Sequence, residues 1–172
     1  RSRNQKCLKT FKNDEIYTPL PVAKLMIDMC ELQPGMSVLD CCLGGGVFSN
    51  NYPEYVKKYY CDLNEGKDFF DCDIKVDWII SNPPYSKWDA WIEKTMKVCD
   101  DFCYIFGFMN FSEQRLNRIF LNGFGLVKMH VCSIDWYFGR SIIAVFKKNE
   151  PSIITISPSV FWCDNCGGRC GR

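Results

Sequence analysis

Two consecutive prolines, Pro83 and Pro84, directly follow the apolar run 76–80 and fix where that run must end. The run has the length and composition of a buried strand. Each proline fixes its own φ angle and lacks a backbone donor, so neither can continue a strand ladder or sit in a helix interior. The local carbonyl groups stay available as acceptors beside the Asn82 amide and the Tyr85 ring. Acceptors next to a flat ring suit a planar group that bears an NH2, which predicts chemistry on an amine or amide nitrogen.

Strand-like and helix-like segments alternate along most of the chain, and a strand pair without an intervening helix closes it. This order predicts an α/β fold with a mostly parallel sheet and an antiparallel edge. Apolar spacing and breaker residues place the helices near 17–33, 88–99 and 113–120, and the strands near 37–40, 59–62, 76–80, 102–108, 126–132 and 141–146.

Composition narrows the setting. The 172 residues, 47% hydrophobic, can bury one good core, and the net charge of +1 neither indicates nor excludes a nucleic-acid partner. No apolar run approaches the roughly 20 residues of a membrane helix, and the basic start lacks a signal peptide. Most of the 12 cysteines fall in apolar segments, where they behave as small hydrophobes. We therefore expect a cytoplasmic protein that is neither secreted nor membrane-bound, with an arm at 1–16, a catalytic domain at 17–150 and an extension at 151–172.

A glycine-rich turn follows the strand that ends at Asp40. Gly44 and Gly46 allow a ligand close approach to the backbone, and residues 47–49 look like the start of a helix. Asp62 lies about 20 residues beyond, where a carboxylate in such folds accepts ribose hydroxyls. These features predict a nucleotide-cofactor loop. The alternative is a turn that needs glycine only for sterics, with Asp62 a solvated acid.

The ordered set of motifs resembles the class I S-adenosylmethionine-dependent amino-methyltransferases, and most closely the adenine-N6 DNA methyltransferases. The resemblance covers residues 17–148; Cys41 stands where the family usually has proline, and Gly45 is an extra glycine. It implies a Rossmann-like fold with a seven-stranded, mostly parallel sheet, an antiparallel C-terminal hairpin and helices on both faces. It also implies S-adenosylmethionine as the cofactor. The motifs, in chain order, are Tyr17-Thr18-Pro19, Asp40-Cys41-Cys42-Leu43-Gly44-Gly45-Gly46, Asp62, Asp68-Phe69-Phe70 and Asn82-Pro83-Pro84-Tyr85.

The resemblance also implies roles for individual residues. The Thr-Pro segment flanks the methionine moiety, the glycine loop holds its amino-acid part, and Asp62 binds the ribose. Asp68 and Phe69 contact the cofactor adenine, unless Asp68 only caps a turn and Phe69 only belongs to the core. The expected cofactor-binding residues are thus Tyr17, Thr18, Pro19, Asp40, Gly44, Gly46, Asp62, Asp68, Phe69 and Asn82.

The catalytic residues expected from the motif are Asn82, Pro83, Pro84 and Tyr85. The exocyclic amine of adenine is a poor nucleophile because its lone pair is delocalised into the ring. Asn82 Oδ1 and the Pro83 carbonyl can each accept one N–H bond, which localises that lone pair by positioning and electrostatics. Tyr85 would stack on the flipped target base. No Pro-Cys dipeptide occurs, which disfavours the cysteine-nucleophile route to C5-methylcytosine.

Further substrate contacts are expected near the final hairpin. Phe138, with Trp136 as the next choice, would stack on the face of the base opposite Tyr85. The alternative is an aromatic cluster that covers the sheet edge. Lys87 and Arg140 would contact phosphates, although each is as readily a plain surface charge.

The C-terminal tail predicts a structural zinc knuckle. Cys163, Cys166 and Cys170 have the spacing of half a zinc site. A fourth ligand could come from Cys7, Cys132, the only histidine, His130, or a second chain. The alternative is a tail with incidental thiols.

Four functions remain open at this point. The first is adenine-N6 methylation of DNA, which we favour over RNA; the same chemistry on ribosomal-type RNA is the second. The third is methylation of a glutamine side-chain amide in a protein. The fourth is a degenerate methyltransferase fold that only binds, which the intact residues 82–85 argue against. Because the chain is short for a sequence-specific DNA methyltransferase, recognition would come from loops, the arm, the tail, a partner subunit or a homodimer.

Overall fold

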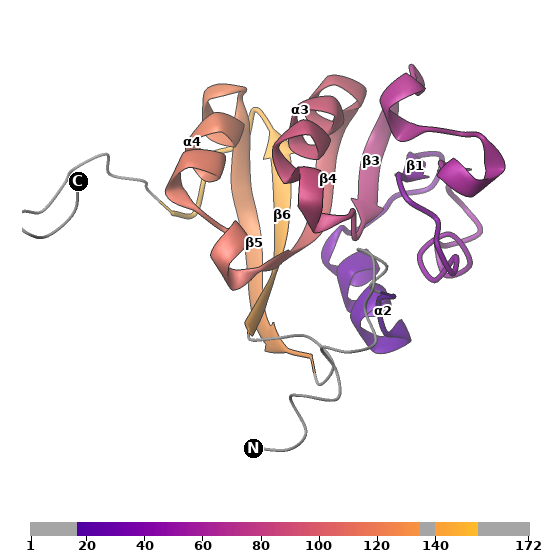
Figure 1. Ribbon diagram of the computed structural model, residues 1–172, viewed down its shortest axis with the longest axis horizontal. Helices are drawn as coiled ribbons and strands as arrows, with labels where there is room; N and C mark the ends of the chain where they lie inside the picture. The colour runs from indigo at the N-terminus through magenta and orange to yellow at the C-terminus, as the bar shows by residue number, and fades with distance from the viewer. Residues whose placement is uncertain (1–16, 135–139, 155–172) are drawn as a thin grey trace, which may run out of the picture.

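A single six-stranded sheet organises the computed structural model, which describes residues 17–134 and 140–154. The strand order is β2-β1-β3-β4-β6-β5 (Figure 1). The strands are β1 (Ser37–Asp40), β2 (Lys57–Tyr60), β3 (Val76–Ser81), β4 (Cys99–Gly107), β5 (Phe124–Ser133) and β6 (Arg140–Lys148). The helices are α2 (Leu20–Met29), α3 (Trp88–Val98) and α4 (Glu113–Leu121), with 3-10 turns η1 (Leu63–Glu65), η2 (Phe69–Asp71), η3 (Tyr85–Lys87) and η4 (Phe108–Asn110).

The pairing confirms the mixed sheet expected from the element order. Strands β2, β1, β3 and β4 run parallel to one another, whereas β6 is antiparallel to both β4 and β5. The central strands are buried on both faces, as parallel strands covered by helices must be. The carboxyl ends of β1, β3 and β4 therefore meet at one edge of the sheet.

The described residues form six strands and not the seven that the family resemblance implies. The chain between β2 and β3 contains η1, η2 and one isolated bridge, Asp62↔Lys67. This stretch is polar, and aspartate side chains cap both 3-10 turns, which stabilises turns in place of a strand. As a result β2 is the edge of the described sheet, and all four of its residues are exposed.

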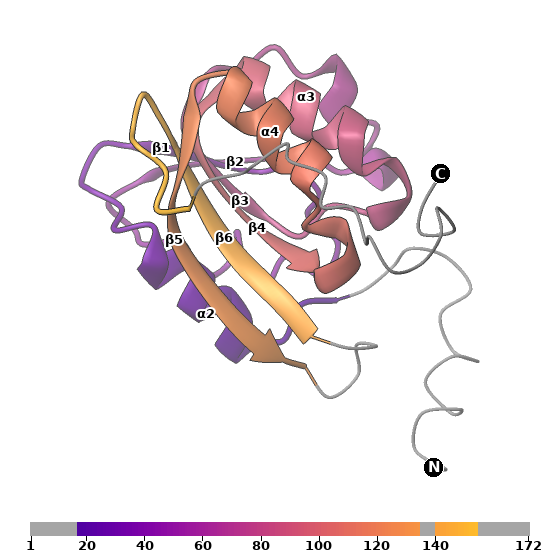
Figure 2. The same ribbon diagram turned by 90° about the vertical axis from the view of Figure 1, so that its left-hand side faces the viewer.

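Helices cover both faces of the sheet. Figure 2 shows α2 on one face and α3 with α4 on the other. The faces have separate apolar clusters: α2 packs on one with Met26 and Ile27, and α3 and α4 pack on the other with Ile92 and Ile119. Burying such side chains stabilises the fold by about 1.5–3 kcal/mol each. None of the helices in the described ranges has the length and apolar character that a membrane span requires.

The helix expected to start at residues 47–49 does not form. After the glycine turn, Asn50 N donates to the Gly46 carbonyl and Tyr52 N to the Phe48 carbonyl, which makes only about one turn. Pro53 then lacks a backbone donor and disfavours a helical conformation at the residue before it. The loop therefore returns directly to β2.

Candidate functional site

An open cleft of about 450 Å³ lies where the carboxyl ends of β1 and β3 diverge into their loops. In open α/β sheets ligands bind at this kind of edge. Three segments distant in sequence line it: the glycine loop, the turns after β2 and the proline motif. The lining residues are Tyr17, Cys41, Cys42, Leu43, Gly44, Asp62, Leu63, Asn64, Lys67, Asp68, Phe69, Phe70, Asn82, Pro84, Ser86, Lys87 and Trp91.

The cleft brings together eight of the residues expected at the site. These are Tyr17, Gly44, Asp62, Asp68, Phe69, Asn82, Pro84 and Lys87. The other expected residues that the structure describes do not line it: Thr18, Pro19, Asp40, Gly46, Pro83, Tyr85 and Arg140. Trp136, Phe138, Cys163, Cys166 and Cys170 fall outside the described residues. Within residues 17–134 and 140–154 no cluster of three or more metal-ligating side chains occurs.

Asp40 lies beneath the glycine loop and fastens two strand ends together. Its carboxylate is fully buried and accepts hydrogen bonds from Ser81 Oγ at 2.8 Å, Ser49 Oγ at 3.3 Å and the Cys42 amide at 3.4 Å. Burial raises the pKa of Asp40 to about 6, against the lowering effect of these donors. Asp40 therefore positions the loop, and its carboxylate does not face the cleft.

The glycine loop uses backbone conformations that residues with side chains rarely adopt. Gly44 and Gly46 have φ angles of +50° and +71°, a region that glycine enters without strain. Gly45 is constrained differently: a Cβ there would lie 3.2 Å and 3.4 Å from two ring atoms of Tyr17. The glycine that departs from the family pattern thus lets the Tyr17 ring pack on the loop at the mouth of the cleft.

Two aspartates shape the opposite wall. Asp62 Oδ1 accepts from the Asn64 amide at 2.8 Å and begins η1, and Asp68 Oδ1 accepts from the Phe70 amide at 2.9 Å and begins η2. Each therefore caps a turn, the structural alternative raised for Asp68, and each also lines the cleft. A carboxylate accepts several hydrogen bonds, so the cap leaves capacity for ligand hydroxyl or amine donors.

An aromatic stack forms the floor between these walls and α3. The Phe69 ring lies parallel to Trp91, with centroids 5.0 Å apart and an interplanar angle of 5°. Phe69 is 2% exposed, so it belongs to the core while one part of it lines the cleft. Both interpretations of Phe69 are compatible with this position.

The proline motif leaves β3 at the other side of the cleft. Cys42 Sγ donates to the Asn82 carbonyl at 3.3 Å and contacts Ser81 Oγ at 3.1 Å, which ties the motif to the glycine loop. Pro83 is buried, whereas Pro84 and Tyr85 are half-buried.

Helix α3 supports the tyrosine of the motif from below. The Tyr85 ring stacks on Trp88 at 5.8 Å, and Trp88 stacks on Phe106 at 4.5 Å with an interplanar angle of 4°. The motif ring therefore rests on a column of core aromatics.

Several lining residues were not expected from the sequence: Cys41, Cys42, Leu43, Leu63, Asn64, Lys67, Phe70, Ser86 and Trp91. Leu63 could have been noticed in the sequence, because it is an apolar residue in a polar stretch directly after the candidate ribose acid. In the structure its side chain is 74% exposed. Cys42 and Trp91 offered none, since their spacing is that of ordinary core positions.

The sequence matches no protein-family model and no curated protein. Its structure is similar to many solved structures, of which three are described. TrmN from Thermus thermophilus has 16% identity and a TM-score of 0.61 over 84% of this chain and 53% of its own. Magnesium protoporphyrin IX methyltransferase (ChlM) from Synechocystis PCC 6803, with bound SAM, has 18% identity and a TM-score of 0.60 over 74% and 76%. A type I restriction-modification methyltransferase subunit from Streptococcus thermophilus has 16% identity and a TM-score of 0.62 over 79% and 45%.

These likenesses show the fold, which is the Rossmann-like fold of class I methyltransferases. The chain spans about half the length of TrmN and of the restriction-modification subunit.

Proposed function

We propose that this chain, built on the class I methyltransferase fold, transfers a methyl group from S-adenosylmethionine to the N6 amine of adenine in nucleic acid, with DNA favoured over RNA. One observation carries the proposal. Asn82 and Pro84 line the same cleft as Gly44, Asp62 and Asp68. A motif suited to an NH2 group and a loop suited to a nucleotide cofactor therefore share one cavity.

The residues present fit the cofactor. The cleft of about 450 Å³ lies within the usual range of small-molecule sites, roughly 300–1,000 Å³. Thr18 Oγ1, next to the lining residue Tyr17, is buried without a hydrogen-bond partner among the described residues, as a hydroxyl awaiting a ligand would be. The glycine loop and Asp62, Asp68 and Phe69 would hold the cofactor, which supplies an electrophilic methyl group when bound. The SAM bound by the structurally similar ChlM supports this assignment.

The chain's own residues would activate the acceptor by position. The Asn82 side-chain oxygen and the Pro83 carbonyl would accept hydrogen bonds from the two N–H groups of the amine and direct its lone pair into the cleft. Methylation of the nitrogen would release one of these two protons to solvent. The Cys42 Sγ bond to the Asn82 carbonyl, at 3.3 Å, holds the motif against the cofactor loop. Tyr85, supported by Trp88, provides a flat surface for the target base.

Three classes of substrate present the planar NH2 group that the motif suits. Adenine in DNA, adenine in RNA and a glutamine amide each present a planar NH2 group, and the stacking surface of Tyr85 favours a base over an amide. Target recognition through a partner subunit or homodimer, and zinc binding by Cys163, Cys166 and Cys170, form part of the proposal.

The test is incubation with radiolabelled S-adenosylmethionine and a panel of duplex DNA, single-stranded DNA, RNA and protein, followed by identification of the methylated atom. We expect N6-methyladenine in nucleic acid. Asn82→Ala should reduce transfer by at least about 100-fold, because one preorganised partner of the reacting group is lost. Its affinity for S-adenosylhomocysteine should stay near that of the wild type. Asn64→Ala, which also removes an amide from the cleft wall, is the matched control and should remain active. Normal turnover of Asn82→Ala would overturn the mechanism.

A further inference from the structure

The 3-10 turn η4 holds two large apolar side chains outside the protein. Phe108 is 60% exposed and Met109 is 88% exposed, directly after the carboxyl end of β4. Phe111, close behind them, turns inward and meets Phe106 edge-on at 5.4 Å. The chain thus buries one aromatic of this turn and presents its apolar neighbours to solvent.

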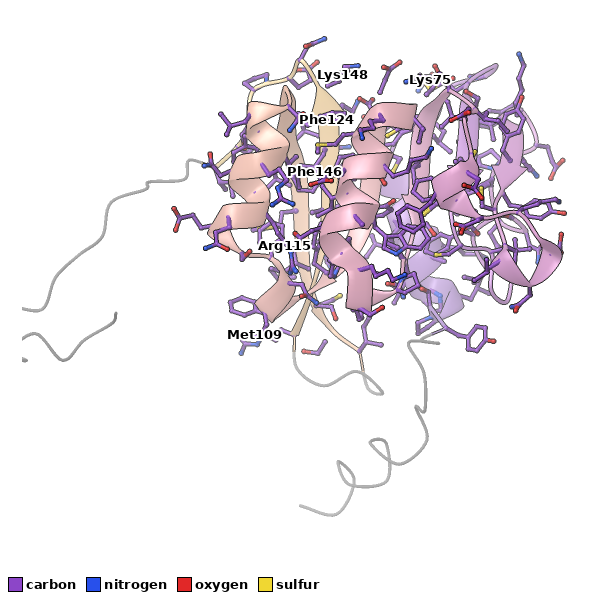
Figure 3. All side chains as sticks on the ribbon, turned by 45° about the horizontal axis from the view of Figure 1, so that its top comes forward. Lys75, Met109, Arg115, Phe124, Phe146 and Lys148 are labelled. Carbon is purple, nitrogen blue, oxygen red and sulfur yellow. The ribbon has the colours of Figure 1, made fainter. Side chains whose placement is uncertain are left out.

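The exposed conformation is held in place by the helices. Arg115 of α4 donates from Nη1 to Asn110 Oδ1 at 2.8 Å and to the Asn110 carbonyl at 3.2 Å. Its Nε donates to Asp89 Oδ1 of α3 at 3.0 Å. Figure 3 shows Arg115 in the space between the two helices, with Met109 near their lower end. A partner binding here would find an ordered surface and lose little conformational entropy in fixing it.

The sheet topology places this turn and the methyl-acceptor motif at the same edge of the sheet. Strand β3 ends at Ser81, which pairs with Tyr104 of the parallel strand β4, and the turns that hold Tyr85 and Phe108 follow the carboxyl ends of these two neighbouring strands. On the other side, Gly107 pairs with Ser141, so Phe108 follows β4 beside Arg140 at the start of β6. Neighbouring strands lie about 4.8 Å apart, so a motif ring, an exposed apolar turn and a cation follow one another along one edge. In Figure 3 Met109 marks this edge, and Lys75 and Lys148 mark the opposite one.

Both cations at this edge are available to a ligand. Lys87 and Arg140 are exposed, and neither forms an ion pair with another residue of 17–134 or 140–154. An aromatic ring beside unpaired cations suits single-stranded nucleic acid, whose bases stack and whose phosphates need positive charge.

We propose that η4 is the contact surface for the nucleotide that adjoins the methyl acceptor: Phe108 stacks on its base, Met109 packs against its sugar, and Arg140 contacts its phosphate. This inference rests on the proposed function, because it places the adjoining base next to a target base that is stacked on the Tyr85 ring. It adds a surface that selects a nucleic-acid strand over an isolated nucleoside.

The test compares the wild type with Phe108→Ala and Met109→Ala. Binding of fluorescent single-stranded DNA and RNA oligonucleotides is followed by anisotropy, and S-adenosylhomocysteine binding by calorimetry. We expect Phe108→Ala to weaken oligonucleotide binding about tenfold, as for loss of one base–aromatic stack, and to leave cofactor-analogue binding unchanged. Leu121→Ala is the matched control, because it removes an 80% exposed apolar side chain at the far end of α4 and should change neither affinity. In Phe108→Trp, oligonucleotide binding should quench fluorescence beyond the change in the wild type.

Each outcome decides the inference. Equal oligonucleotide affinity in the wild type and Phe108→Ala, with both forming N6-methyladenine, overturns the role of η4 and leaves the proposed function standing. If the wild type binds S-adenosylhomocysteine but neither binds nor methylates nucleic acid, both the role of η4 and the proposed function are overturned. Methylation of a protein amide that Phe108→Ala impairs assigns η4 to a protein partner and overturns the nucleic-acid occupant.

Discussion

Ser81→Ala removes the shortest hydrogen bond to the buried Asp40 carboxylate. Ser81 Oγ lies 2.8 Å from Asp40 Oδ1, whereas Ser49 Oγ and the Cys42 amide lie at 3.3 Å and 3.4 Å. A hydrogen bond to a charged group contributes about 1.5–3 kcal/mol. Because Asp40 and Ser81 are both fully buried, we expect the free energy of unfolding to fall by about 2 kcal/mol at pH 8, where Asp40 is ionised.

The effect should depend on pH in a defined direction. Burial raises the pKa of Asp40 from 3.8 to about 6. The folded protein therefore binds more protons than the unfolded chain between about pH 4 and pH 6, and stability falls as pH rises through that window, by roughly 3 kcal/mol from this residue. The Ser81 bond lowers that pKa, so Ser81→Ala raises it further. At pH 5 the Asp40 carboxyl is mostly protonated in the folded state, and the loss should shrink to about 1 kcal/mol.

Urea unfolding followed by tryptophan fluorescence at pH 5 and pH 8 measures both effects. Asp40→Asn should flatten the pH dependence, and the double variant with Ser81→Ala should show strong non-additivity at pH 8. Ser141→Ala is the matched control, because Ser141 is a buried serine of the same sheet with no carboxylate partner within the described residues. Equal losses for Ser81→Ala at both pH values, or additive single variants, would refute the assignment of Asp40 as an ionised anchor.

Two further predictions concern glycines. Gly45→Ala should displace the Tyr17 ring, which would lie 3.2 Å from the new Cβ. We expect S-adenosylhomocysteine binding, measured by calorimetry, to weaken about fivefold. If the same loss of affinity persists in a Tyr17→Ala background, the Tyr17 ring is not its cause. Gly125→Ala would place a Cβ against the Glu150 carbonyl and the Pro151 backbone, so we expect a loss of about 3 kcal/mol in thermal unfolding, whereas the exposed Ser133→Ala should change little. An unchanged melting temperature for Gly125→Ala would show that the backbone after β6 yields freely.

The spacing of apolar residues predicted most of the fold, because each main helix buries one apolar stripe and each main strand contains one apolar run. The helix expected at 88–99 occurs as Trp88–Val98, and the pair at 126–132 and 141–146 is the observed β5–β6 hairpin. Local sequence could also order the motifs along one sheet edge, since parallel strands bring their carboxyl ends together.

Other parts depend on contacts between distant residues and carry no local signal. The packing of Tyr17 on Gly45 and the bond from Cys42 to the Asn82 carbonyl join segments that the sequence separates widely. The count of seven strands came from the family resemblance alone, since the sequence pattern placed only six; between β2 and β3, aspartate caps stabilise two short turns.

The aromatic column beneath Tyr85 links the motif to the interior. Tyr85 rests on Trp88, Trp88 on Phe106, and Phe106 contacts Phe146 edge-on at 6.1 Å. The Tyr85 ring is therefore the outer end of a series of ring contacts that begins in the C-terminal hairpin. A substitution at Phe106 or Phe146 would therefore disturb the packing beneath the motif tyrosine. Because Trp88 stacks on Tyr85, its fluorescence should change when a ligand stacks on the Tyr85 ring.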